Sequence, residues 1–458
     1  MAVIKRVAVL PADSPSGQQA EKSYLRTQLR TGAIWSLIFQ IASKSSLFVI
    51  GGVAARLLSV QDLGRLFATQ GLLILLVAVA DRGISLYLER NIAAARLRRG
   101  SLRVQFVVRA MESVASFGIC FVGFTTFTTY SNGVCAWFSL AFTAMYFSIT
   151  TNAALQGFQN FRTSALTQTT GRLVYLAAIL LIVAADERSI AGVAAAWALG
   201  EITIAVTQSV WILKSRARGG GYAQHVYAAV PRDSAIRSYR RLAARAVPYW
   251  ISVVAYLAYN RADSTIVLLF SNARQAGLYA PASNIQTALM VIPSALTGAM
   301  AVVGAAAIGR GEASTRDLLA EVKRLSIRAV LASLALAAAA TAIAPYIILV
   351  FAGRAYQSSD LPTRIIVWSL PLNAVEFSLL GLLISLGFPG KTIWFYLTTL
   401  SASLVANAAL TPHFGAVGGA WAAVIREPFG CAVLIYHTRR SIRGTLNRTP
   451  ARHQAQAE

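Results

Sequence analysis

Charged side chains that interrupt long apolar stretches are the residues of this sequence best suited to do chemistry. Twelve Asp, Glu, Lys and Arg residues lie inside such stretches, and eight lie near the middle: Lys44, Arg172, Glu201, Arg261, Asp263, Glu376, Arg426 and Glu427. Eight charges facing lipid at mid-bilayer would cost roughly 20–28 kcal/mol, at roughly 2.5–3.5 kcal/mol each. That cost exceeds the net stability of a typical fold. These side chains are therefore expected to face one another or a water-filled chamber.

The eight charges divide into two sets that suit different tasks. The cations, which are candidates for binding a substrate through charge-assisted hydrogen bonds, are Lys44, Arg172, Arg261 and Arg426. The acids, which are candidates for carrying a proton or sodium ion or for pairing with the cations, are Glu201, Asp263, Glu376 and Glu427. Four cations against four acids favour an anionic or zwitterionic cargo.

The spacing of these residues bears on how they pair. Glu201 is a candidate partner for Arg172, on an adjacent predicted helix. Arg261 and Asp263 stand two residues apart, which is roughly 200° around a helix. We therefore expect one of them to face the chamber and the other to face a neighbouring helix.

A second group of charges lies nearer the predicted inner boundary of the membrane. Asp81 and Arg82 precede Gly83, where a gating or helix-ending role competes with substrate contact. Arg109 and Glu112 lie one helical turn apart, so a structural pair is expected there.

Metal and nucleotide chemistry find no support in the residue pattern. The sequence has four histidines and three cysteines, none in CxxC or HxxxH spacing, so neither a zinc site nor a disulfide framework is predicted. No GxxxxGK[ST] motif is present. We expect no cofactor, and any driving force must come from an ion gradient or from consumption of the cargo.

The elements that position these charges are predicted to be membrane-spanning helices. Of the 458 residues 56% are hydrophobic and 13% charged, and the mean hydropathy is +0.57, which excludes an ordinary soluble enzyme. Twelve apolar stretches are long enough to span a bilayer: 32–58, 64–84, 104–127, 134–157, 166–185, 190–213, 246–270, 277–308, 327–351, 365–386, 392–410 and 416–436.

The spans predict two similar halves. A lobe of six helices at 32–213 and another at 246–437 are joined by a basic linker at 214–245 and flanked by tails at 1–31 and 438–458. Because six is even, both halves start on the same side and are predicted to be parallel repeats. A faint echo between Leu63–Ala68 and Ala276–Ala280 supports the repeat.

The distribution of Lys and Arg predicts the orientation. With the N-terminus inside, inner segments carry 30 of them and outer segments carry six, namely Arg56, Arg65, Arg188, Arg274, Arg354 and Arg364. This asymmetry predicts that both termini and the linker are cytoplasmic. The net charge of +24 is then explained mostly by the orientation of the protein in the membrane, so no nucleic acid partner is expected.

The predicted outer face argues against an enzyme. No outer loop exceeds roughly a dozen residues on this span count, and the outer acids are few. A membrane-embedded glycosyl transferase or ligase acting there would need an extramembrane platform with catalytic groups. We therefore expect a protein that is not an enzyme.

Five short motifs, in order along the chain, resemble those of a transporter family. They are Ala54–Gly64, Tyr259–Asp263, Ala276–Ala282, Val350–Tyr356 and Thr411–Ala420. Together with twelve predicted spans they resemble the oligosaccharide-lipid flippases of the multidrug/oligosaccharidyl-lipid/polysaccharide (MOP) exporter superfamily. The resemblance implies an all-α, MATE-like fold with two six-helix lobes around a central cavity that opens alternately to each side.

The resemblance also implies a function and partners. The implied cargo is an undecaprenyl-diphosphate-linked oligosaccharide for O-antigen, capsule or exopolysaccharide assembly, moved across a bacterial inner membrane. The partners would be this lipid-linked substrate, membrane lipid, and a polysaccharide polymerase or chain-length protein. An ion-coupled multidrug exporter of the same fold is the main alternative, and a transferase or ligase is the rival from another class.

Overall fold

The computed structural model describes residues 45–93, 101–158, 160–217, 232–261, 263–291, 315–385 and 388–446. Every regular element in these ranges is helical. Eight of the described helices are long and apolar enough to cross a membrane, and Ser45–Leu57 is a shorter apolar helix. The chain is an all-helical, multi-pass membrane protein. Lys44, which is predicted to bind substrate, lies outside the described residues.

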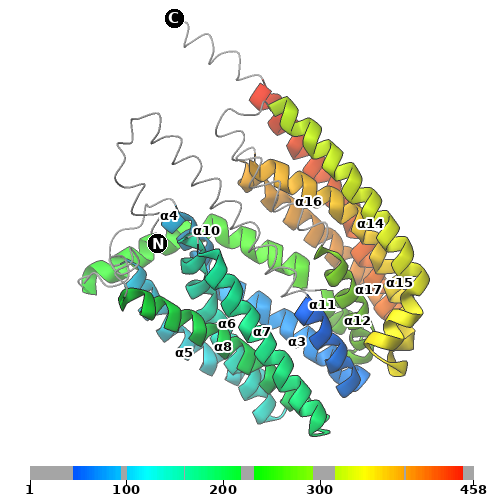
Figure 1. Cartoon of the computed structure of the whole chain (residues 1–458), viewed down its shortest axis with the longest axis horizontal. Coiled ribbons are helices and arrows are strands. Elements are labelled where there is room, and N and C mark those ends of the chain that lie inside the picture. The colour runs from blue at the N-terminus through cyan, green and yellow to red at the C-terminus, as the bar shows by residue number, and fades with distance from the viewer. Residues whose placement is uncertain are drawn as a thin grey trace, which may run out of the picture.

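The helices form two groups. The first is Ser45–Leu57, α3 (Val60–Asp81), α4 (Ile84–Ala93), α5 (Ser101–Phe127), α6 (Asn132–Gly157), α7 (Phe161–Ala184) and α8 (Ile190–Ala217). The second is α10 (Arg232–Arg261), α11 (Asp263–Phe270), α12 (Ala273–Leu289), α14 (Thr315–Phe351), η1 (Arg354–Ser359), α15 (Asp360–Ile366), η2 (Val367–Ser369), α16 (Leu370–Ser385), η3 (Pro389–Lys391) and α17 (Thr392–Leu446). Figure 1 shows α5–α8 on one side, α14–α17 on the other, and α3, α11 and α12 between them.

Several predicted spans are divided or merged in the structure. The span predicted at 246–270 covers the end of α10 and all of α11, with residue 262 between them outside the described residues, and the span predicted at 365–386 is built from α15, η2 and α16. The last two predicted spans form one long helix, α17, whose backbone leaves helical geometry at Gly415 (φ 55°, ψ −127°). That break falls between the two predicted stretches. Pro428 lies inside α17 without a break in its helical geometry, and Gly415 is the non-helical residue.

Side-chain caps help to fix where the helices begin. The Ser59 hydroxyl accepts from the backbone N–H of Asp62 at the start of α3, and the Asn272 side chain accepts from that of Gln275 at the start of α12. Such caps satisfy backbone donors that the first turn leaves free. The capping residues therefore determine where α3 and α12 begin. The first turns of these two helices contact each other at the glycine crossing described below.

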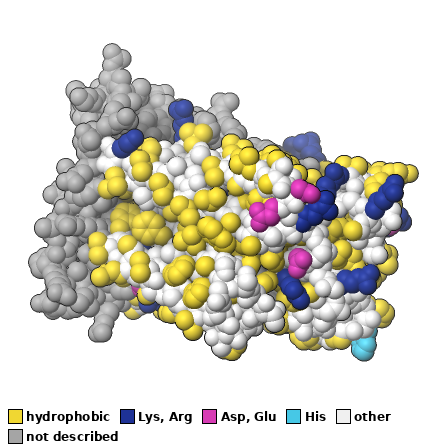
Figure 2. Space-filling model, turned by 90° about the horizontal axis from the view of Figure 1, so that it is seen from below, with side chains coloured by type: hydrophobic (Ala, Val, Ile, Leu, Met, Phe, Trp, Pro, Cys, Tyr) yellow, Lys and Arg dark blue, Asp and Glu magenta, His cyan; other side chains and the backbone are white. Residues whose placement is uncertain are grey.

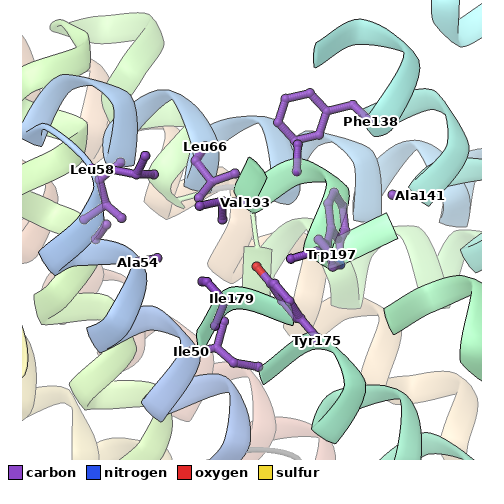
Figure 3. Packing of buried hydrophobic residues seen from close by; sticks show 14 of the residues in the cluster. Ile50, Ala54, Leu58, Leu66, Phe138, Ala141, Tyr175, Ile179, Val193 and Trp197 are labelled. Atoms are coloured by element: carbon purple, nitrogen blue, oxygen red, sulfur yellow. The ribbon is translucent and has the colours of Figure 1, made fainter. Parts of the chain in front are cut away.

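The first group packs around a core of aromatic and branched side chains. Phe138, Tyr175 and Trp197, from α6, α7 and α8, belong to this buried cluster with Ile50 and Ala54 of the first helix. Figure 3 shows Tyr175 beside Trp197. Elsewhere, hydrophobic side chains cover much of the face in Figure 2, and its charged side chains gather toward one end. An apolar exterior of this kind suits a lipid environment.

Two glycines let α3 and α12 cross closely. A Cβ on Gly64 would lie 2.0 Å from the carbonyl oxygen of Ala273, and one on Gly277 would lie 1.8 Å from that of Val60. These glycines occupy matching places in the two echoed segments noted in the sequence. The echo therefore marks the place where the two halves touch.

We expect Gly277→Ala to destabilise the protein, because its methyl group collides with backbone that has no room to yield. Overpacking of this kind costs roughly 1–3 kcal/mol. The matched control is Gly118→Ala in α5, where no atom lies within 4 Å of the added Cβ, so stability should be kept or slightly raised. Thermal melting in detergent measures both, and equal melting of the two variants would contradict the close crossing.

Candidate functional site

The candidate site is an internal cavity between the two groups of helices. Its volume is about 130 Å³. The polar or charged side chains that line it are Gln70, Arg172, Tyr175, Trp197, Glu201, Asn260, Asp263, Ser264, Ser283, Asn284 and Thr287. They come from α3, α7, α8, α10, α11 and α12. The cavity thus offers many hydrogen-bonding groups together with a few charges.

The charges on the α7 and α8 wall form one ion pair. Arg172 Nη1 lies 2.7 Å from Glu201 Oε1, and the indole N–H of Trp197 donates to the same oxygen at 3.2 Å. The Nε of Arg172 is buried without a hydrogen-bond partner. The predicted pairing of Glu201 with Arg172 therefore exists, and it leaves Arg172 with donor capacity beside the cavity.

The opposite wall carries Asp263, which is bound by an arginine behind it. Arg426 Nη1 donates to both Asp263 oxygens, at 2.6 and 2.9 Å, and Arg426 Nε donates to Glu427 Oε1 at 3.1 Å. The Arg426 side chain is 5% exposed and is not among the cavity-lining residues. The structure thus places this predicted substrate ligand in ion pairs.

A tyrosine joins these ion pairs to a third acid. The Tyr259 ring lies under the Arg426 guanidinium, 4.6 Å away. Its hydroxyl lies 3.0 Å from Glu427 Oε2 and 3.4 Å from Glu376 Oε2, and Asn373 Nδ2 donates to Glu376 Oε2 at 3.4 Å. We call Asp263, Glu376, Glu427, Arg426 and Tyr259 the buried acid cluster. The cluster holds three carboxyl groups and one guanidinium, and the guanidinium pairs with two of the carboxyl groups, Asp263 and Glu427. An added proton or sodium ion would therefore lower the excess of negative charge.

Arg261 is the last residue of α10, next to cavity-lining Asn260, and its side chain lies outside what the structure describes. Asp263 is the first residue of α11, and residue 262 lies outside the described residues. The predicted opposition of Arg261 and Asp263 therefore stays a prediction.

The predicted gating residues lie away from the cavity, where α3 ends. Asp81 is buried and paired with Arg109, whose Nη2 lies 2.6 Å from Asp81 Oδ1. Arg82 adopts a left-handed conformation (φ 54°) and pairs with Glu112. Arg109 is also 3.6 Å from Glu112, but its closest carboxylate is Asp81. These charges therefore stabilise a break between two helices.

That break contacts the other half of the molecule. Gly83 has φ 70°, and a Cβ there would lie 2.3 Å from the backbone nitrogen of Trp250 in α10. Next to it, Arg90 Nη1 donates to the Tyr249 hydroxyl at 3.1 Å. Along α3, the cavity-lining stretch from Leu66 to Ile74 lies between this contact and the Gly64 crossing. The halves therefore touch on both sides of the cavity.

Sequence reasoning missed three of these partners: Asp263 for Arg426, Asp81 for Arg109, and Tyr259 as the bridge between Glu376 and Glu427. Each contact joins different helices, over separations of 163, 28, 117 and 168 residues. A comparison of how deep Arg426 and Asp263 lie within their predicted spans could have suggested this pair.

Comparison with solved structures identifies the fold. An inward-facing multidrug-resistance MATE family transporter of the MOP superfamily has a TM-score of 0.67 at 14% identity, over 90% of this chain and 95% of that one. A MOP superfamily transporter from Pyrococcus furiosus, whose pocket of reversed polarity suggests a different function, gives 0.62 at 14% identity over 91% and 96%. The lipid II flippase MurJ gives 0.62 at 12% identity over 90% and 87%.

Comparisons at the level of sequence are negative. No protein-family model matches the chain, and no curated protein matches it. The structural likeness, at identities of 12–14%, establishes the fold, which is that of MOP superfamily transporters. The expected MATE-like, all-helical architecture is confirmed.

Proposed function

We propose that the protein is a flippase that moves an undecaprenyl-diphosphate-linked oligosaccharide from the inner to the outer leaflet of a bacterial inner membrane. Both termini are cytoplasmic in this proposal, as the charge distribution predicts. The observation that carries it is the lining of the cavity, which combines the Arg172 guanidinium with amide and hydroxyl side chains. Such a wall replaces the hydration of sugar hydroxyls and of a diphosphate.

The ion pairs of the cavity acids favour an anionic cargo over a cationic one. Among the residues that the structure describes, the carboxylates that line the cavity are Glu201 and Asp263, and each is held by an arginine. Their charge is therefore already neutralised within the protein. We assign direct contact with the diphosphate to Arg172, with Lys44 and Arg261 as further ligands, and we assign Arg426 to holding Asp263.

The two contacts between the halves support alternating access. The cavity is bounded along α3 by the Gly64–Gly277 crossing at one end and by the Gly83–Trp250 contact at the other. Opening one contact while the other stays closed would expose the cavity to one side at a time. Asp81 and Arg82 act at the second contact as gating residues, by fixing the break between α3 and α4.

A multidrug exporter is the second candidate, because Glu201 and Asp263 line the cavity and could attract an organic cation if their arginines moved away. Binding to the purified protein separates the two functions. We expect an undecaprenyl-diphosphate-linked sugar to bind and to be competed by unlabelled diphosphate lipid. A fluorescent organic cation that binds instead, and that the diphosphate lipid does not displace, would favour the exporter.

Ion coupling is proposed for the buried acid cluster, where Glu376 contacts Tyr259 and Asn373. We expect Glu376→Gln to remove the dependence of transport on a proton or sodium gradient, because the amide has no site for the ion. Uptake into vesicles with and without a gradient measures this, and Glu187→Gln, at an exposed acid outside the cluster, is the control for the loss of one acid. Unchanged gradient dependence after Glu376→Gln combined with Asp263→Asn would exclude coupling through this pair.

A further inference from the structure

A second hollow lies in the α14–α17 half, away from the central cavity. We call it the α14/α16/α17 groove, after the helices that line it. Its volume is about 460 Å³, and its apolar wall includes Ile327, Val330, Leu331, Val375, Leu379 and Leu382. Ile327 and Leu331 are well exposed on α14. An open apolar groove on the outside of a membrane protein can accept a hydrocarbon chain.

Two polar side chains of the groove lack partners. Lys323 lines the groove and is exposed, and within the described residues it makes no hydrogen bond or ion pair. Thr438 of α17 lines the same groove and is 5% exposed, and its hydroxyl has no hydrogen-bond partner. Buried hydroxyl groups nearly always have a partner. The groove therefore presents an ammonium group and a hydroxyl, and both can donate to an acceptor bound there.

The positive charge near Lys323 and Thr438 favours an anionic acceptor in the groove. Lys323 is its only charged lining residue in the part of the chain that the structure describes, and Arg439 and Arg440 follow Thr438 in α17. Basic pockets between membrane helices bind anionic lipid headgroups. The predicted orientation places this end at the inner leaflet, since Lys323 and Arg439 are among the inner cations.

We propose that the α14/α16/α17 groove binds an anionic phospholipid of the surrounding bilayer. Its phosphate contacts Lys323 and accepts a hydrogen bond from Thr438, and one acyl chain lies along Ile327, Leu331 and Leu379. The site is separate from the central cavity and does not depend on the identity of the cargo. It differs from the groove between Ser45–Leu57 and α14, where Arg56 already donates to the carbonyl oxygen of Val350.

Native mass spectrometry of the full-length protein tests the proposal, with phosphatidylglycerol and phosphatidylcholine of identical acyl chains as probes. We expect wild-type protein to prefer phosphatidylglycerol. Lys323→Ala should weaken that binding about tenfold or more, since it removes a charge-assisted contact. Thr438→Val keeps the shape of the side chain and should weaken it by a smaller factor. Lys323→Ala should weaken phosphatidylcholine binding by a smaller factor, because the choline cation offsets the phosphate charge, so the preference for phosphatidylglycerol should shrink.

Lys214→Ala is the matched control, because Lys214 is an exposed lysine near the end of α8 in the other half. It should leave the preference for phosphatidylglycerol unchanged. The proposal is overturned if wild-type protein shows no such preference, or if Lys323→Ala and Lys214→Ala weaken it equally. It is also overturned if an undecaprenyl diphosphate lipid displaces phosphatidylglycerol, because the groove would then belong to the cargo. Lys323→Gln replaces Lys323→Ala if the latter melts earlier without lipid.

Discussion

Replacing Arg426 with Ala should sharply reduce the amount of folded protein in the membrane. Arg426 holds Asp263 and Glu427, and the Glu427 side chain is 0% exposed. Removing one partner of a buried ion pair costs roughly 3–5 kcal/mol, because it leaves the other charge uncompensated. Two carboxylates lose their cation here, so this is the largest effect on stability that we expect from one substitution.

The partners of Arg426 supply the rescue test. The triple variant Arg426→Met, Asp263→Asn, Glu427→Gln removes the uncompensated charges and should restore abundance. Arg188→Ala is the control, because Arg188 and Asp186 form an exposed pair whose side chains are 72% and 83% exposed, and exposed pairs contribute little. Quantitative membrane immunoblotting checks all three. Normal abundance with lost transport in Arg426→Ala would instead make Arg426 a direct substrate ligand.

Replacing Arg172 with Ala should abolish most transport when equal amounts of folded protein are compared. The yield of folded protein should also fall, because the buried Glu201 carboxylate loses its arginine. We expect a loss of about 10- to 150-fold in affinity for a diphosphate cargo, which corresponds to a charge-assisted contact of roughly 1.5–3 kcal/mol. Arg172→Lys keeps the charge but loses the planar fork, so its loss should be partial. Binding of labelled lipid-linked sugar to purified protein measures the series.

Glu201 provides the control for Arg172. If Arg172 only neutralises Glu201, the double variant Arg172→Ala, Glu201→Gln should recover binding, because no unpaired acid remains. If Arg172 contacts the cargo, the double variant should remain as defective as Arg172→Ala. Recovery of binding in the double variant would therefore remove Arg172 from the substrate site.

The sequence was sufficient to predict the helical, membrane-spanning fold, because spans of apolar residues have a length that the bilayer dictates. It also located the charges that must avoid lipid, since their cost does not depend on the details of packing. The break at Gly415 lies between the last two predicted spans. The contact between the Gly64 and Gly277 segments was not predicted, because the likeness of the two segments indicated only a repeat.

The partners of the charges were less predictable. A span can be rotated about its axis and shifted in depth with little change in hydropathy, so a sequence does not state which side chain meets which. Arg426 was expected to contact substrate or Glu427, but it also binds Asp263, 163 residues away. Arg109 was paired with its neighbour Glu112, whereas its closest carboxylate is Asp81, on a different helix.

Sidedness of a lipid-linked oligosaccharide in reconstituted vesicles tests the central claim most directly. The purified protein is placed in liposomes containing a fluorescent undecaprenyl-diphosphate-linked sugar, and a membrane-impermeant reagent reports how much of the sugar faces outward. We predict that wild-type protein moves the labelled headgroup across the bilayer without changing its covalent structure, and that the equally abundant Arg172→Ala protein does not. Equal rates for protein-free, Arg172→Ala and wild-type vesicles would contradict the account.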